Sequence, residues 1–118
     1  MLIIDEAFGW SCANGQIEVA KLLLENGVNI HADNDFAFLL SCLNGHIDVA
    51  KFLLKKGANI HADNDYAFRW SCRNWHIKVA KLLCEQCEEY SVVIKKNKIL
   101  KYFLNNNAMN IEFGLLKL

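Results

Sequence analysis

The side chains with the greatest potential for chemistry in this 118-residue chain are its cysteines. Cys84 and Cys87 form a C-x-x-C pair, a spacing found in half of a zinc site or in a redox pair. A structural zinc ion needs four ligands, and the sequence contains no second C-x-x-C pair. We therefore interpret Cys84 and Cys87 as structural residues, and we predict no metal ion and no other cofactor.

Two other cysteines are each followed four residues later by a histidine, at Cys42–His46 and Cys72–His76. A thiol beside an imidazole is a nucleophile and its base. A third cysteine in the same local sequence, Cys12, is followed at that spacing by Gln16, which cannot act as a base. We interpret these cysteines as small buried apolar residues and the histidines as partners of the turn backbone. We predict that the chain is not an enzyme.

The triplet Asp-Asn-Asp occurs twice, at residues 33–35 and 63–65. It resembles the start of a calcium-binding loop, but the glycine and the distant glutamate of such a loop are missing. Asp and Asn side chains bond their own backbone in turns, so we predict two turns with an acidic edge.

Lys95, Lys96, Lys98 and Lys101 form a basic cluster near the C-terminus. Phosphate could contact it, but this stretch lacks the arginines and the interleaved aromatic residues of a nucleic-acid site. We predict a solvated helix face and no nucleic-acid partner. No apolar run reaches the roughly 18 residues of a membrane helix, so we also predict no membrane partner and an intracellular location.

The elements that must position these residues follow a thirty-residue period. Residues 7–36 and 37–66 are identical at twenty of thirty positions without a gap, and a third copy begins at Ala67 and decays after Leu83. A fixed period of this length predicts a stack of small units, in which each unit contacts only its neighbours.

Each unit contains two helical patterns. In the second copy, the first pattern ends at Asn44-Gly45, and the second runs from Ile47 to Leu54 with apolar residues at intervals of three and four. We predict an all-α fold with three antiparallel helix pairs. Its helices are expected near residues 6–14, 16–26, 36–44, 46–56, 66–74 and 76–87.

The segment NGHIDVAKFLLKKGANIHA, residues 44–62, resembles the second half of an ankyrin repeat, with its GH turn, its V-x-x-LL helix and its G-A-x-I-x-A exit. AFLLSC stands where that repeat has TPLH-x-AA, so that Ala37 takes the proline place and Phe38 the leucine place. The resemblance implies an α-solenoid of stacked ankyrin-type helix pairs with short hairpin loops, which binds other proteins and brings no catalytic residues. The wording is also similar to repeats abundant in giant DNA viruses of amoebae, which implies the cytoplasm of an infected cell.

We interpret residues 1–118 as one domain, with repeats at about 7–36, 37–66 and 67–90 and a degenerate C-terminal cap at 91–118. The third repeat departs from the others at two turns. Trp75 replaces the glycine between the two helices, and Cys87 replaces the glycine that closes the second helix. We predict that the turn at Trp75 is reshaped. We also predict that the helix from Ile77 continues towards Glu89.

Partner binding is expected where exposed positions differ between the copies. Two such positions are four residues apart on the first helix, and they hold Gly9, Leu39 and Arg69, and Ala13, Leu43 and Arg73. We predict an apolar spot and a basic spot on the concave face, with acidic hairpin tips beside them. The partner-binding residues would be Leu39, Leu43, Arg69, Arg73, Asp33, Asp35, Asp63 and Asp65. The alternative for the two leucines is that they pack against a neighbouring unit.

Charge separates along the chain although the formal net charge is zero. Residues 1–36 carry six acidic side chains and one lysine, a net charge of −5, and residues 67–118 carry nine basic and four acidic side chains, a net charge of +5. Both ends also carry apolar residues, at 1–4 and 111–118. The protein partner is unknown from sequence. The alternative function is that of a structural segment of a longer array that associates weakly with itself, head to tail.

Overall fold

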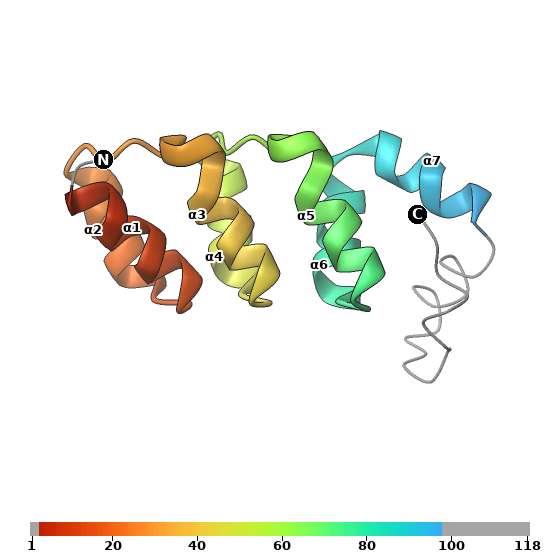
Figure 1. Ribbon diagram of the computed structural model, residues 1–118, viewed down its shortest axis with the longest axis horizontal. Helices are drawn as coiled ribbons and strands as arrows, with labels where there is room; N and C mark the ends of the chain where they lie inside the picture. Colours follow the sequence, from red (N-terminus) through yellow and green to blue (C-terminus); the bar gives the residue numbers. More distant parts are fainter. Residues whose placement is uncertain (1–2, 98–118) are drawn as a thin grey trace.

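The computed structural model describes residues 3–97, and their regular structure is entirely helical (Figure 1). The helices of this range are α1 (Ile3–Ala13), α2 (Ile17–Glu25), α3 (Ala32–Leu43), α4 (Ile47–Lys55), α5 (Ala62–Arg73), α6 (Ile77–Gln86) and α7 (Glu88–Lys96). The predicted all-α class is confirmed, and the first six helices fall at the six predicted places. None of the helices within residues 3–97 is long and apolar enough to cross a membrane.

The helices form three pairs, α1 with α2, α3 with α4, and α5 with α6, which stand side by side in chain order (Figure 1). The first helices of the pairs contact one another much more closely than the second helices do. The side formed by α1, α3 and α5 is therefore the more closely packed side of the stack. The predicted stack of helix pairs is therefore confirmed.

The turn between the two helices of a pair uses a left-handed residue in every unit. Gly15 has φ +73° and Gly45 has φ +74°, and Trp75 takes the same conformation with φ +61°. The amide of His76 donates to the carbonyl of Ser71 at 2.9 Å, as the equivalent amides do in the other units. The prediction that Trp75 reshapes its turn is wrong. Its ring is buried, and that burial offsets the cost of about 1–2 kcal/mol for a left-handed non-glycine residue.

The two Asp-Asn-Asp triplets form turns, as predicted, and all three residues of each turn are left-handed. The φ values lie between +52° and +61°. Asp and Asn tolerate this conformation better than other side chains, because their short polar groups bond locally. The carboxylate of Asp35, for example, contacts His31 Nδ1 at 3.0 Å. These turns lie near the start of the ranges given for α3 and α5, so the right-handed part of each helix begins after residues 35 and 65.

The core repeats with the period of the sequence. Phe8, Phe38 and Phe68 are buried, and Cys12, Cys42 and Cys72 are buried beside them. Burial raises the pKa of each of these three thiols to about 12, so they are protonated at neutral pH and poor nucleophiles. The prediction that the three cysteines are buried apolar residues is confirmed.

The first unit is less covered than the units that follow it. Val49 and Val79 are each 1 % exposed because the preceding unit covers them, whereas Val19, at the same position of the first unit, is 43 % exposed. The apolar surface that joins one unit to the next is therefore open at the N-terminal end of the described stack.

The second helix of the third unit does not continue as predicted. Helix α6 ends at Gln86, and Cys87 is extended, with φ −142° and ψ 112°. Helix α7 then starts at Glu88 and packs against α6. An extended residue redirects the chain without needing the left-handed conformation that glycine supplies in the other units. The rest of the predicted cap, from Lys98 to Leu118, lies outside the described residues.

Candidate functional site

A groove opens between α1 and α3. Its volume is about 310 Å³. Three features describe it: aromatic walls, a small-residue gap and an acidic rim. It is lined by Asp5, Glu6, Phe8, Gly9, Trp10, Ala32, Asp33, Phe36, Ala37 and Leu40.

Two large aromatic side chains lie in the groove and face solvent. Trp10 is 66 % exposed and Phe36 is 46 % exposed, whereas Phe8 and Ala37 are buried. Exposed aromatic side chains that gather in a concave site are typical of interaction surfaces, where they supply large contact areas at a small cost in side-chain entropy. The site can therefore bind an apolar or a flat cationic group of a partner.

The groove depends on Gly9. A Cβ atom built at this helical glycine meets nothing within 4 Å. In the second unit the same position holds Leu39, which is 6 % exposed and belongs to the core. The sequence analysis identified this position because its residue differs between the copies. It predicted a binding role only for the leucine and the arginine that occupy it in the other units. The sequence feature that indicates the groove is the lack of a side chain at Gly9.

Acidic residues contribute to the lining of the groove. Asp5, Glu6 and Asp33 all line it, and Glu6 and Asp33 are exposed. They belong to the segment 1–36, whose net charge is −5. A concave site with charge of one sign on its rim concentrates ligands of the opposite sign. The electrostatics of the groove favour a positively charged partner.

The two predicted leucines do not form an exposed spot. Leu39 is buried in the core, and Leu43 is half-buried and packs against that core. The expectation that Leu39 is exposed is wrong, because its helix lies close enough to α5 for a leucine to fill the space between them. The position of Leu39 varies between the copies although it lies at the junction of two units and not on the exposed surface.

Two of the four predicted aspartates join neighbouring units. Asp35 is buried, and its carboxylate accepts a hydrogen bond from the backbone amide of Asn59 at 2.7 Å and contacts His31 Nδ1 at 3.0 Å. The expectation that Asp35 lies on an exposed acidic edge is wrong, since its carboxylate instead satisfies an amide of the next unit. The carboxylates of Asp33 and Asp63 remain exposed at the hairpin tips.

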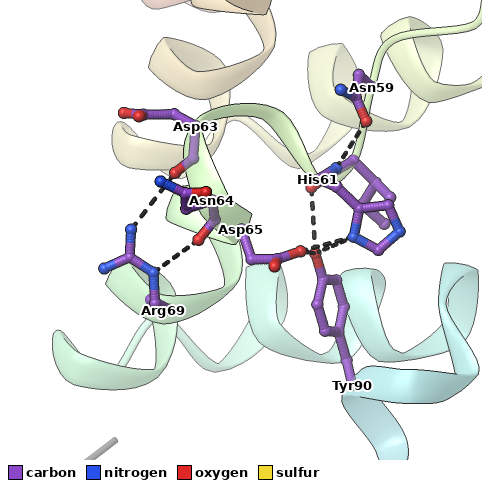
Figure 2. Close-up of polar contacts among 8 residues, drawn as sticks. Asn59, His61, Asp63, Asn64, Asp65, Arg69 and Tyr90 are labelled. Atoms are coloured by element: carbon purple, nitrogen blue, oxygen red, sulfur yellow. Dashed lines mark hydrogen bonds and ion pairs between the residues drawn. The ribbon is translucent and has the colours of Figure 1, made fainter.

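Asp65 makes the corresponding link at the next junction, where Tyr90 takes the role of the amide. The Tyr90 hydroxyl donates to Asp65 Oδ1 at 2.5 Å, and His61 Nδ1 contacts the same oxygen at 2.6 Å (Figure 2). The hydrogen bond from Tyr90 lowers the pKa of Asp65, with His61 as the second contribution. Burial, and then the bond to Asp65, raise the pKa of Tyr90 above its usual range.

The ring of Tyr90 closes the third unit. It stacks on Phe68 with the centroids 4.1 Å apart and the planes 4° from parallel. Tyr90 stands thirty residues after Ile60, so the period places it at an apolar junction position. The sequence analysis did not predict a role for this residue because the third copy decays after Leu83.

The two predicted arginines are both exposed, on α5. Arg69 folds back on the turn that precedes it: Nε donates to the carbonyl of Asn64 at 2.8 Å, and its terminal nitrogen lies 3.4 Å from the carbonyl of Asp63 (Figure 2). Its guanidinium also lies 5.6 Å from the ring centroid of Tyr66. Arg73 lies one turn further along the helix.

The cysteines and histidines considered first play structural roles. Burial raises the pKa of Cys84 to about 11, and Cys84 and Cys87 are half-buried free thiols. Within residues 3–97 no group of three His, Cys, Asp or Glu side chains could hold a metal ion. The ring of His46 lies against Gly15 of the preceding unit, and burial lowers the pKa of His76, whose ring packs on Trp70.

Comparison with known families matches residues 8–97 to the model of ankyrin repeats in three copies. The matched range contains the three helix pairs and α7, and it covers more than half of the chain. No curated protein matches the chain in a sequence search.

Proposed function

Because the chain belongs to the ankyrin-repeat family, whose repeats generally mediate protein–protein interactions, we propose that it is a non-catalytic module that binds another protein. The partner would lie on the concave face made by α1, α3 and α5. The observation that carries this proposal is the groove between α1 and α3, with the exposed rings of Trp10 and Phe36.

The groove would hold the anchor residues of the partner. A volume of about 310 Å³ is at the lower end of the range for ligand pockets, so it accommodates one or two side chains. A specific interface buries roughly 1,200–2,000 Å² in total, which requires contacts beyond the groove. We propose that the exposed charges Asp33, Asp63, Arg69 and Arg73 form part of the polar rim around it.

Filling the groove is expected to abolish partner capture. A Gly9→Leu variant should lower the recovery of the specific partner from expressing cells by about tenfold or more, because the new side chain occupies the space of the anchor. The fold should persist, since leucine forms helix better than glycine by roughly 0.5–1 kcal/mol and meets open space at this position. Quantitative mass spectrometry after affinity purification measures the recovery.

The matched control is Lys51→Leu, which adds the same side chain to an exposed position of α4 away from the groove. Proteins that bind leucine-bearing surfaces non-specifically are recovered equally with both variants. A partner that is retained by Lys51→Leu and lost by Gly9→Leu supports the proposal. Equal recovery of every protein by the wild type and Gly9→Leu contradicts it.

An intracellular location is part of the proposal. All five cysteines are free thiols, which is typical of proteins kept in a reducing compartment. The similarity of the repeats to those of giant DNA viruses supports the cytoplasm of an infected cell as the more specific location.

Self-association is the second candidate function, and the two ends of the described stack favour it. Val19 and Leu22 are exposed at the acidic end. At the other end Val92 and Val93 are exposed on α7, two residues before the basic pair at 95–96. An apolar patch next to opposite charge at each end suits a heterologous, head-to-tail contact. Since α7 covers α6, the contact would use the outer side of α7.

Light scattering at two salt concentrations tests self-association. Charge pairs on a surface are screened over about 8 Å at physiological ionic strength, so association should be weak and should increase when salt is lowered. The double variant Lys95→Glu/Lys96→Glu should remain monomeric under both conditions. A wild-type monomer in low and high salt at matched concentration excludes this candidate.

A further inference from the structure

The turn before α5 forms a small binding site for a guanidinium group, and Arg69 of α5 occupies it. The left-handed turn at 63–65 presents the carbonyls of Asp63 and Asn64 to this side chain, at 3.4 Å and 2.8 Å (Figure 2). The Tyr66 ring lies beneath the guanidinium, 5.6 Å from centroid to Cζ. Two carbonyls and an aromatic face are groups that recognise the planar, positively charged end of an arginine.

The turn before α3 repeats this arrangement without the arginine. Asp33 and Asn34 have φ and ψ values within about 6° of those of Asp63 and Asn64, so their carbonyls are presented in the same way. Phe36 takes the place of Tyr66. The position of Arg69, however, holds Leu39, which is buried in the core. The ring of Phe36 therefore faces the groove and is 46 % exposed.

Resting on the proposed function, we infer that the groove binds an arginine side chain from a basic segment of the partner protein. Its guanidinium lies over Phe36 and donates to the carbonyls of the left-handed turn before α3, as Arg69 does at the turn before α5. Trp10 also lines the groove, and Gly9 leaves room for the side chain to enter.

Charge complementarity supports the basic character of the segment. Asp5, Glu6 and Asp33 line the groove, and the first 36 residues carry a net charge of −5. The rim attracts neighbouring cations of the segment, which raises the rate of association and its dependence on salt. Lysine satisfies the charge but lacks the flat fork of donors, so arginine is preferred.

Selection from a phage-displayed library of random dodecapeptides tests the inference. Immobilised wild-type protein is the target, and Gly9→Leu protein removes peptides that bind elsewhere. The expected result is a set of basic peptides that contain arginine. Replacing that arginine by the neutral isostere citrulline in a synthetic peptide should weaken binding by about tenfold or more, because a charge-assisted hydrogen bond and a cation–π contact are lost.

Two aromatic variants locate the binding site. Phe36→Ala should weaken peptide binding by a similar factor, whereas Tyr66→Ala, the same change one unit further along, should leave it within about twofold. Enrichment of acidic or neutral peptides, an unchanged affinity with citrulline, or equal effects of the two variants overturns the inference. Peptides that match the chain's own segment around residues 92–96 would assign the groove to a second copy and also overturn it.

Different experimental outcomes contradict arginine binding in the groove and the proposed function. If Gly9→Leu abolishes capture of the cellular partner while the library yields no arginine-dependent peptide, the groove binds a partner of other chemistry. If neither experiment depends on Gly9, the proposed function itself is wrong for this site.

Discussion

A Tyr90→Ala variant is expected to lose about 3–5 kcal/mol of unfolding free energy, the cost typical of deleting a buried aromatic side chain. Tyr90 is buried, its ring stacks on Phe68, and its hydroxyl bonds to Asp65. The substitution removes all these contacts and leaves the last junction of the stack open. Urea denaturation followed by circular dichroism measures the loss, and a loss below about 1 kcal/mol would show that α7 does not stabilise the stack.

A Tyr90→Phe variant separates the ring from the hydroxyl. It should lose only about 1 kcal/mol at pH 7, because the stacked ring remains and Asp65 is partly exposed. The hydroxyl lowers the pKa of Asp65, so this contribution is present above the ordinary pKa of an aspartate and is lost as the pH falls through the lowered value. The difference between wild type and Tyr90→Phe should therefore narrow below about pH 4. A difference that is independent of pH would assign the effect to packing.

The second large effect is expected at the turn of the first unit, for Gly15→Ala. Gly15 has φ +73°, and a Cβ atom there would lie 2.6 Å from His46 Nδ1. The left-handed alanine costs about 1–2 kcal/mol and the overlap about 1–3 kcal/mol, which together predict a loss of about 2–5 kcal/mol. The loss is measured by the same urea denaturation.

Gly27→Ala is the control for the backbone conformation. Gly27 has φ +90°, but a Cβ atom there meets nothing within 4 Å, so only the conformational cost of about 1–2 kcal/mol is expected. In a His46→Ala background, Gly15→Ala should cost no more than Gly27→Ala, because the overlapping ring is gone. Equal losses for both glycine variants in the wild-type background would contradict the close approach of His46.

The sequence predicted the architecture well because a repeat period carries redundant information. The pattern of a helix pair occurs three times. A helix that is poorly defined in one copy can therefore be assigned from the other copies. The two wrong predictions about the chain path, at Trp75 and after Gln86, both fall where a copy departs from its neighbours. A residue that differs in one copy can have two effects. Either the backbone changes its conformation, or the backbone is kept and burial of the new side chain offsets the strain. The sequence alone does not distinguish them. The structure shows the second outcome for Trp75.

The candidate site was less predictable because it depends on the spacing between units. The sequence identified the varying position of Gly9, Leu39 and Arg69, but it could not show that α3 and α5 lie close enough to bury the leucine. Nor could it show that the glycine leaves a groove. The aspartates of the turns were recognised as turn formers, but their bonds to the next unit join residues 24 and 25 positions apart, which no local pattern encodes.

The openness of the first unit has a consequence for local unfolding. Val19 is 43 % exposed where the equivalent valines are covered, so within residues 3–97 the pair α1 and α2 is stabilised by contacts with one neighbouring pair. Amide protons in this pair should exchange with solvent sooner than those in α3 to α6. The groove lies between α1 and α3. A bound segment would therefore contact both the pair α1 and α2, which opens most readily, and the pair α3 and α4, which stabilises it. Occupancy would then slow exchange in the first unit most, and the affinity of the partner would include the free energy of closing that unit.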